Sequence, residues 1–204
     1  MKKTLRNFVL AMLFIGATTM TYAQIEITPQ YGYQIGSKYN FYNGYVKLTD
    51  SEQYGITLNI DVNGQGTQAE IFWVYQDSEV RVLDYFLYPF ETTITDVTAN
   101  HFQFGVIQNF QDGDFRPFAG MSAGFTVFDP ADSFYSSRTK FTLGFSGGIK
   151  YFFTDRIGIR LQTQLLMPIE WGGVYISSGG GGVTVGGSLI QLNFSGGLIF
   201  ALGE

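Results

Sequence analysis

The chain contains no cysteine and only one histidine among its 204 residues. Without cysteine it can form no disulfide and offers no thiol nucleophile or thiolate ligand. A transition-metal site normally takes several histidine or cysteine ligands, so such a site is not expected here. We expect no bound metal and no cofactor.

Basic residues are also scarce. The 12 lysines and arginines are outnumbered by 17 aspartates and glutamates, which gives a formal net charge of −5. A nucleic-acid-binding domain needs a basic surface to neutralise phosphates. We therefore expect no nucleic-acid partner.

The only long apolar run lies at the N-terminus and is too short for a membrane-spanning helix, which needs about 20 apolar residues. Lys2, Lys3 and Arg6 precede an apolar stretch over residues 8–16, and the small residue Ala23 follows. This order is typical of a secretory signal peptide. We predict that residues 1–23 are removed on export and that residues 24–204 form one domain.

Glycine and aromatic residues are plentiful, with 26 glycines and 17% aromatics. Residues 140–153 and 157–167 alternate between apolar side chains and small or polar ones, on either side of a break at Thr154 and Asp155. Alternation with a period of two is the pattern of a β-strand with one apolar face. Two strands of this length joined by a tight turn match a membrane-spanning hairpin, because about 9–11 tilted residues cross the hydrocarbon.

The same alternation predicts eight strands, over residues 25–35, 54–62, 67–76, 100–110, 115–128, 140–153, 157–167 and 188–202. The connections between them are alternately long and short, and one long connection should hold a short ribbon near residues 45–48. Short turns at one end and long loops at the other are typical of an outer-membrane barrel. Aromatic residues should form two girdles, near the loop end (Tyr33, Trp73, Tyr75, Phe102, Phe125, Phe141) and near the turn end (Phe110, Tyr151, Phe153, Phe200).

Four stretches also resemble a known family. Residues 116–130 (RPFAGMSAGFTVFDP) and 139–162 (TKFTLGFSGGIKYFFTDRIGIRLQ) look like the second half of the eight-stranded outer-membrane β-barrel domain of the OmpA/OmpX-like superfamily, and residues 27–36 and 51–62 fit its first two strands. The resemblance covers nearly all of residues 24–204. It implies an all-β, eight-stranded antiparallel up-and-down transmembrane β-barrel in the Gram-negative outer membrane. The implied partners are lipid, lipopolysaccharide and, during insertion, the barrel-assembly machinery. Unlike many members, the chain ends on Glu204 and not on an aromatic residue.

An eight-stranded barrel is filled by its own side chains. If the apolar faces point outward, the interior contains charged and polar groups, which are costly to bury unless they pair. We expect a polar network in the lumen, formed by Glu26, Asp61, Glu70, His101, Lys150 and Arg160 with Lys140 near the loop end. The alternative to a network that fills the lumen is a small polar conduit or gate formed by Glu70 and Arg160.

We do not expect an enzyme. Some barrels of this kind are lipid A deacylases or palmitoyltransferases that use His, Ser and an acidic residue. Here His101 is predicted to point inward, and Ser136 or Ser137 would reach it only through loop folding. An inward histidine of this kind is more often structural.

The function expected is therefore a structural or surface-interaction role through the long loops over residues 77–97 and 170–187. Tyr85, Trp171 and Tyr175 are the candidate contacts to a surface ligand that the sequence does not identify. Two alternatives remain open: a low-conductance channel for small solutes, and a soluble lipocalin-like ligand carrier with the apolar faces turned inward.

Overall fold

The computed structural model describes residues 24–42, 44–85, 88–132, 134, 136–169, 174–177, 180–183 and 190–203. The predicted signal peptide, residues 1–23, lies outside these ranges. No helix in the described ranges is long and apolar enough to cross a membrane.

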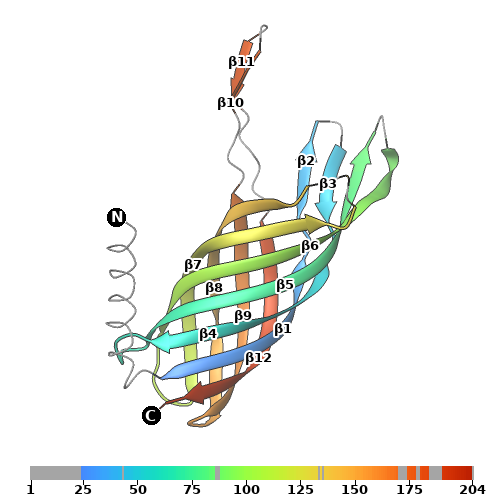
Figure 1. Ribbon diagram of the computed structural model, residues 1–204. Helices are drawn as coiled ribbons and strands as arrows, with labels where there is room; N and C mark the ends of the chain where they lie inside the picture. The colour runs from blue at the N-terminus through green and yellow to red at the C-terminus, as the bar shows by residue number, and fades with distance from the viewer. Residues whose placement is uncertain are drawn as a thin grey trace, which may run out of the picture.

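The chain folds into a closed antiparallel β-barrel of eight strands (Figure 1). Each barrel strand pairs with the next one along the chain, and β12 pairs with β1 to close the cylinder. The eight strands are β1 (Ile25–Ile35), β4 (Ser51–Asp61), β5 (Thr67–Asp84), β6 (Tyr88–Asn109), β7 (Phe115–Pro130), β8 (Arg138–Thr154), β9 (Ile157–Ile169) and β12 (Gln191–Leu202). The fold predicted from the sequence is confirmed.

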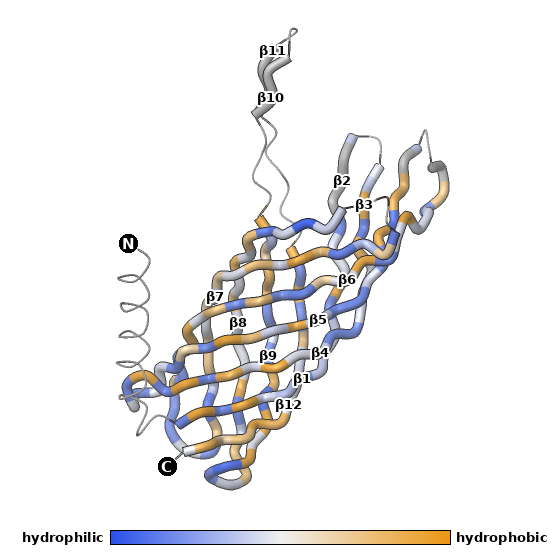
Figure 2. Tube along the Cα trace, in the orientation of Figure 1, coloured by the Kyte–Doolittle hydropathy of each residue, from blue (hydrophilic) through white to orange (hydrophobic). Residues whose placement is uncertain are grey.

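Side chains alternate between the two surfaces of the barrel, as the pleat of a strand requires. Most buried side chains are charged or polar, with small apolar clusters among them, whereas the exposed surface includes Phe104, Met121, Phe145, Leu161 and Leu198. The aromatic residues of both predicted girdles also point outward; Tyr54 packs against Trp73 and Tyr75, and Tyr151 packs against Phe153. Figure 2 shows the resulting alternation of apolar and polar residues along every barrel strand.

This arrangement is the reverse of a lipocalin. A soluble carrier needs an apolar interior and a polar exterior, and here the buried set is dominated by glutamine, asparagine, threonine and charged residues. The lipocalin-like alternative is therefore wrong.

The segment 77–97, predicted to be a long loop, is instead a continuation of two strands. β5 runs on to Asp84 and β6 begins at Tyr88, so only residues 85–87 separate the two strands. Two register shifts, after Val80 and after Val82, bend this part of the hairpin. The sequence did not reveal this continuation of β5 and β6 because neither face of a strand has to be uniformly apolar beyond the barrel wall.

A second hairpin adds to the same sheet. β2 (Lys38–Phe41) pairs with β3 (Gly44–Leu48), and β3 pairs with the end of β5. This is the short ribbon predicted near residues 45–48. We call β2, β3 and the parts of β5 and β6 from residue 77 to residue 96 the sheet extension; it projects from the loop end of the barrel (Figure 1). A separate two-stranded sheet, β10 (Val174–Ser177) with β11 (Gly180–Val183), lies within the predicted 170–187 loop.

Pro29 coincides with a break in the pairing of β1 with β12. It lies within β1, where the cross-strand pairing with β12 is interrupted between Ile27 and Gln30. Proline has no N–H to donate to the ladder, so it is tolerated where pairing breaks.

Candidate functional site

The lumen near the turn end contains two rows of charged residues that face each other. Glu26 on β1 and Glu70 on β5 flank Asn59 of β4, to which both are directly paired in register. Lys150 on β8 is paired in the same way with Arg160 on β9. Because the barrel is closed, the two cations lie opposite the two anions.

Each cation forms an ion pair with one anion. The distance from Lys150 Nζ to Glu26 Oε2 is 2.5 Å, and from Arg160 Nη2 to Glu70 Oε2 it is 2.7 Å. All four side chains are at most 2% exposed. Arg160 also lies over the ring of Phe118, with 4.5 Å from its guanidinium carbon to the ring centroid.

Amide side chains satisfy the remaining hydrogen-bonding groups. Gln68 accepts a hydrogen bond from Lys150 Nζ (2.6 Å) and donates one to Glu26 Oε1 (2.8 Å), which closes a triangle. Arg160 donates from Nη1 to Asn59 Oδ1 (2.9 Å) and from Nε to Gln162 Oε1 (2.7 Å). Buried charges are tolerated only in this condition, paired and hydrogen-bonded.

Two of the predicted network residues lie at the two ends of the barrel, away from the ion pairs. Asp61 is the last residue of β4, and its carboxylate accepts hydrogen bonds from the backbone N–H groups of Asn63 and Gly64 in the turn that follows. It lies on the same face of β4 as Asn59, but its carboxylate stabilises the Asn-Gly turn that follows and does not take part in the ion pairs. Lys140 lies near the loop end of β8, among the residues of the apolar pocket described below.

His101 lies in the lumen, closer to the loop end than the ion pairs are. Its Nδ1 is 2.8 Å from Thr126 Oγ1 and its Nε2 is 3.2 Å from Gln76 Oε1. A carbonyl oxygen can only accept, so Nε2 carries the proton and Nδ1 accepts from the threonine hydroxyl. Both ring nitrogens therefore have partners, and neither Ser136 nor Ser137 is one of them.

Part of the lumen wall, on β1, β9 and β12, is lined by carboxamide side chains. Asn193 on β12 is directly paired in register with Gln34 on β1 and with Gln164 on β9. Within the described residues, neither side-chain atom of Asn193, Gln164 or Gln191 has a hydrogen-bond partner, although all are buried. Leaving a buried amide unpaired costs about 1–3 kcal/mol per group, so these amides favour contact with water or a polar solute.

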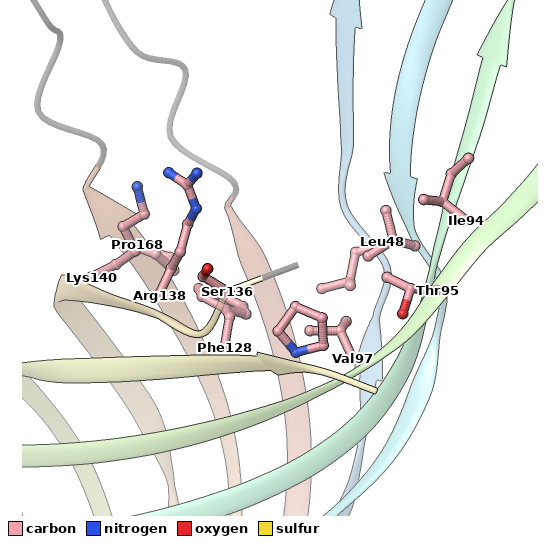
Figure 3. Close-up of a pocket in the computed structure, with 11 residues that line it drawn as sticks. Leu48, Ile94, Thr95, Val97, Phe128, Ser136, Arg138, Lys140 and Pro168 are labelled. Carbon is pink, nitrogen blue, oxygen red and sulfur yellow. The ribbon is translucent and has the colours of Figure 1, made fainter. Parts of the chain in front are cut away.

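At the loop end the interior changes character from polar to apolar. A pocket of about 290 Å³ lies at the mouth of the barrel (Figure 3). Seven of the eleven described lining residues are apolar, and the other four are two hydroxyl residues and two cations: Leu48, Val80, Ile94, Thr95, Val97, Phe128, Pro130, Ser136, Arg138, Lys140 and Pro168. We call this pocket the vestibule. The sequence did not reveal it because four of these residues lie in or beside the segment predicted to be a loop.

The candidate loop contacts are only partly described. Tyr85 is 69% exposed at the tip of the hairpin between β5 and β6. Trp171 and the side chain of Tyr175 lie outside the described residues. In the described ranges, no three histidine, aspartate or glutamate side chains come close enough together to bind a metal ion.

Solved structures with a similar fold come from bacterial outer membranes. Neisserial surface protein A is 13% identical, with a TM-score of 0.59, over 87% of this chain and 97% of that chain. The outer membrane protein OprG from Pseudomonas aeruginosa is 11% identical, with a TM-score of 0.63, over 90% of this chain and 98% of that one. No protein-family model and no curated protein sequence matches the chain. The structural likeness, the closed eight-stranded sheet and the apolar exterior together show that the chain has the fold of the eight-stranded outer-membrane β-barrel proteins.

Proposed function

We propose that the protein is an integral outer-membrane barrel that acts at the cell surface through its loop end, without enzymatic activity. The observation that carries the proposal is the sheet extension, which continues the barrel wall beyond its loop end (Figure 1). In barrels of this type the long connections face outward from the cell and the short turns face the periplasm. The extension would therefore present Tyr85, Phe90 and Tyr42, all strongly exposed, at the surface.

Internal contacts support an extension that keeps a fixed shape. Arg81 forms ion pairs with Glu79 (2.8 Å) and with Glu91 (3.5 Å), and the Tyr45 hydroxyl donates a hydrogen bond to Glu91 (2.9 Å). These contacts connect β3, β5 and β6. A surface held in one conformation loses less entropy on binding a partner than a mobile loop does.

Membrane insertion is tested first. The mature chain, extracted from membranes in detergent, should migrate faster on gels unboiled than boiled, because the closed barrel survives until it is heated. A chain recovered in the soluble fraction, with no such shift, would contradict the membrane assignment.

The surface role is tested with a shortened chain. Residues 78–95 are replaced by a two-residue Asn-Gly turn, and the gel shift shows whether the barrel still closes. Cells that lack the protein are then complemented with either form, and cell-surface attachment and detergent sensitivity are compared. If only the full chain restores the lost property, the extension carries the function; if the shortened barrel restores it fully, the role is structural.

A low-conductance channel is the second candidate, favoured by the unpaired carboxamides in the upper lumen. The ion pairs below them fill the section near the turn end, so conduction would require Arg160 and Glu70 to separate. Planar-bilayer recordings compare the wild type with the double variant Glu70→Gln/Arg160→Met. A wild type that does not conduct, or one whose conductance the double variant leaves unchanged, removes this pair from consideration as a gate.

A further inference from the structure

The vestibule has a composition that folding alone does not require. Its apolar side chains lie at the mouth of a barrel whose buried side chains are mostly polar. Apolar surface that faces water costs roughly 25 cal/mol per Å², and surface loops are normally polar. An apolar concavity of this kind is more often a ligand site than an accident of packing.

The charges at its rim identify the class of ligand. Arg138 and Lys140 lie at the loop end of β8, on one side of the pocket, while Leu48, Ile94 and Val97 lie on the other side (Figure 3). None of the described lining residues is acidic. The described lining therefore contains two cationic side chains and no carboxylate, on a chain that is acidic overall.

We propose that the vestibule binds an anionic amphiphile with a single hydrocarbon chain, such as a fatty-acid anion. The hydrocarbon chain would lie against Leu48, Val80, Val97 and Phe128, and the carboxylate would lie near Arg138. Thr95 and Ser136 are the hydroxyl groups that line the same pocket. At about 290 Å³ the pocket is at the small end of the range for small-molecule sites, which runs from about 300 to 1,000 Å³, and this favours one chain over a two-chain lipid.

The probe is laurate, titrated into the mature chain in nanodiscs of zwitterionic lipid, with methyl-labelled isoleucine, leucine and valine observed by NMR. The expected result is a saturable shift of the methyl signals of Leu48, Ile94 and Val97. The methyl signals of Ile56 and Leu198, which point outward from the barrel, report non-specific partitioning into the bilayer. Dodecyltrimethylammonium, with the same chain and the opposite charge, is the matched control ligand.

Two variants test the two parts of the site. Ile94→Trp fills the apolar space and should reduce laurate affinity at least about tenfold, since a ligand chain and the indole cannot occupy the same volume. Arg138→Gln should weaken laurate about two- to fivefold, the effect expected for an exposed ion pair, and should leave dodecyltrimethylammonium unaffected. Arg156→Gln, an exposed arginine at the turn end, is the control and should change neither.

Folding is checked for each variant by the unboiled gel shift, so a loss of binding can be separated from a loss of structure. The proposal is overturned if laurate and dodecyltrimethylammonium shift the vestibule methyls alike, if Ile94→Trp binds laurate as well as the wild type does, or if only the outward methyls respond. A barrel that lacks the surface role proposed above could still bind laurate, so the two proposals fail independently.

Discussion

At the scale of single residues, the distinctive feature is the neutral group of four charges in the lumen. Lys150 and Arg160 are neighbours on adjacent strands and would repel each other without the carboxylates opposite. Glu26 and Glu70 supply those carboxylates at ion-pair distance. The charges therefore stabilise the barrel only as a balanced set.

The ion pairs lead to a prediction about stability. Glu26→Gln should destabilise the barrel by about 3–5 kcal/mol, because it leaves Lys150 buried without a counter-charge. The double variant Glu26→Gln/Lys150→Met should recover most of this loss. Urea unfolding in lipid vesicles, followed by the gel shift, measures both, and Arg156→Gln should stay within about 0.5 kcal/mol of the wild type. Equal losses in the single and double variants would show that the two side chains do not act as a pair.

A second residue-scale prediction concerns acid and the sheet extension. The hydrogen bond from Tyr45 holds the pKa of Glu91 below its usual value, with a further contribution from Arg81, and the same bond raises the pKa of Tyr45. A carboxyl whose pKa is lowered by folding adds stability that is complete above its ordinary pKa of about 4.3 and is lost as the pH falls through the lowered value. The contact between β3 and β6 should therefore weaken only in strong acid.

The measurement is a titration of the Glu91 side-chain carbon by NMR. Tyr45→Phe should move the pKa of Glu91 upward, because the donated hydrogen bond is gone. Tyr42→Phe is the matched control: Tyr42 is fully exposed, so this change should leave Glu91 as it is in the wild type. If both variants titrate alike, the Tyr45 contact does not set the pKa.

At the scale of elements, the close pairing of barrel strands depends on glycine at specific positions. A Cβ at Gly124 on β7 would overlap the carbonyl oxygen of Phe102 and would lie 2.8 Å from the Cα of Gln103, both on β6. Backbone atoms in a ladder cannot move aside as the end of a side chain can. The spacing of β6 and β7 therefore requires glycine here.

We predict that Gly124→Val lowers stability by about 1–3 kcal/mol, the usual cost of inserting atoms into a packed site. Ala123→Val is the neighbouring control; it faces the other surface and adds apolar area there, so it should be close to neutral. The measurement is the urea unfolding midpoint of each variant in lipid vesicles, compared with that of the wild type. A Gly124→Val barrel as stable as Ala123→Val would show that the strands adjust more freely than the structure indicates.

At the scale of the whole molecule, the outward-facing side chains determine whether the barrel is stable in water or in a lipid bilayer. Phe104 is 62% exposed in the middle of a barrel strand, and Met121 is 66% exposed. In water, a charged residue at such a position would be harmless. In a bilayer, arginine on the lipid face costs about 2–4 kcal/mol at the midplane and little near the interfaces.

Phe104→Arg should therefore destabilise the barrel by about 2–4 kcal/mol in lipid vesicles. Phe90→Arg, on the sheet extension, should have little effect. Equilibrium unfolding by urea in the same vesicles compares the two variants. Equal stability of both would mean that Phe104 does not face hydrocarbon, which would contradict the membrane assignment.

The sequence by itself determined the barrel. A period of two, sustained in eight segments, fixes which side chains share a face, and alternating short and long connections fix an up-and-down topology. The bounds of β1, predicted as residues 25–35, agree with the structure because its alternation ends sharply at both ends. The polar set that includes Glu26, Glu70, Lys150 and Arg160 could be assigned to one surface for the same reason.

Only the tertiary structure decided how these residues combine. Ion-pair partners depend on register and on closure between β1 and β12, which bring residues 26 and 150 together although 124 positions separate them. The sheet extension and the vestibule depend on pairings beyond the barrel wall, where no bilayer imposes an alternation that a sequence could display. For Asp61, the sequence predicted which face of the strand the side chain occupies. It did not predict that the carboxylate accepts hydrogen bonds from the backbone of the following turn, because that depends on the local geometry of the turn.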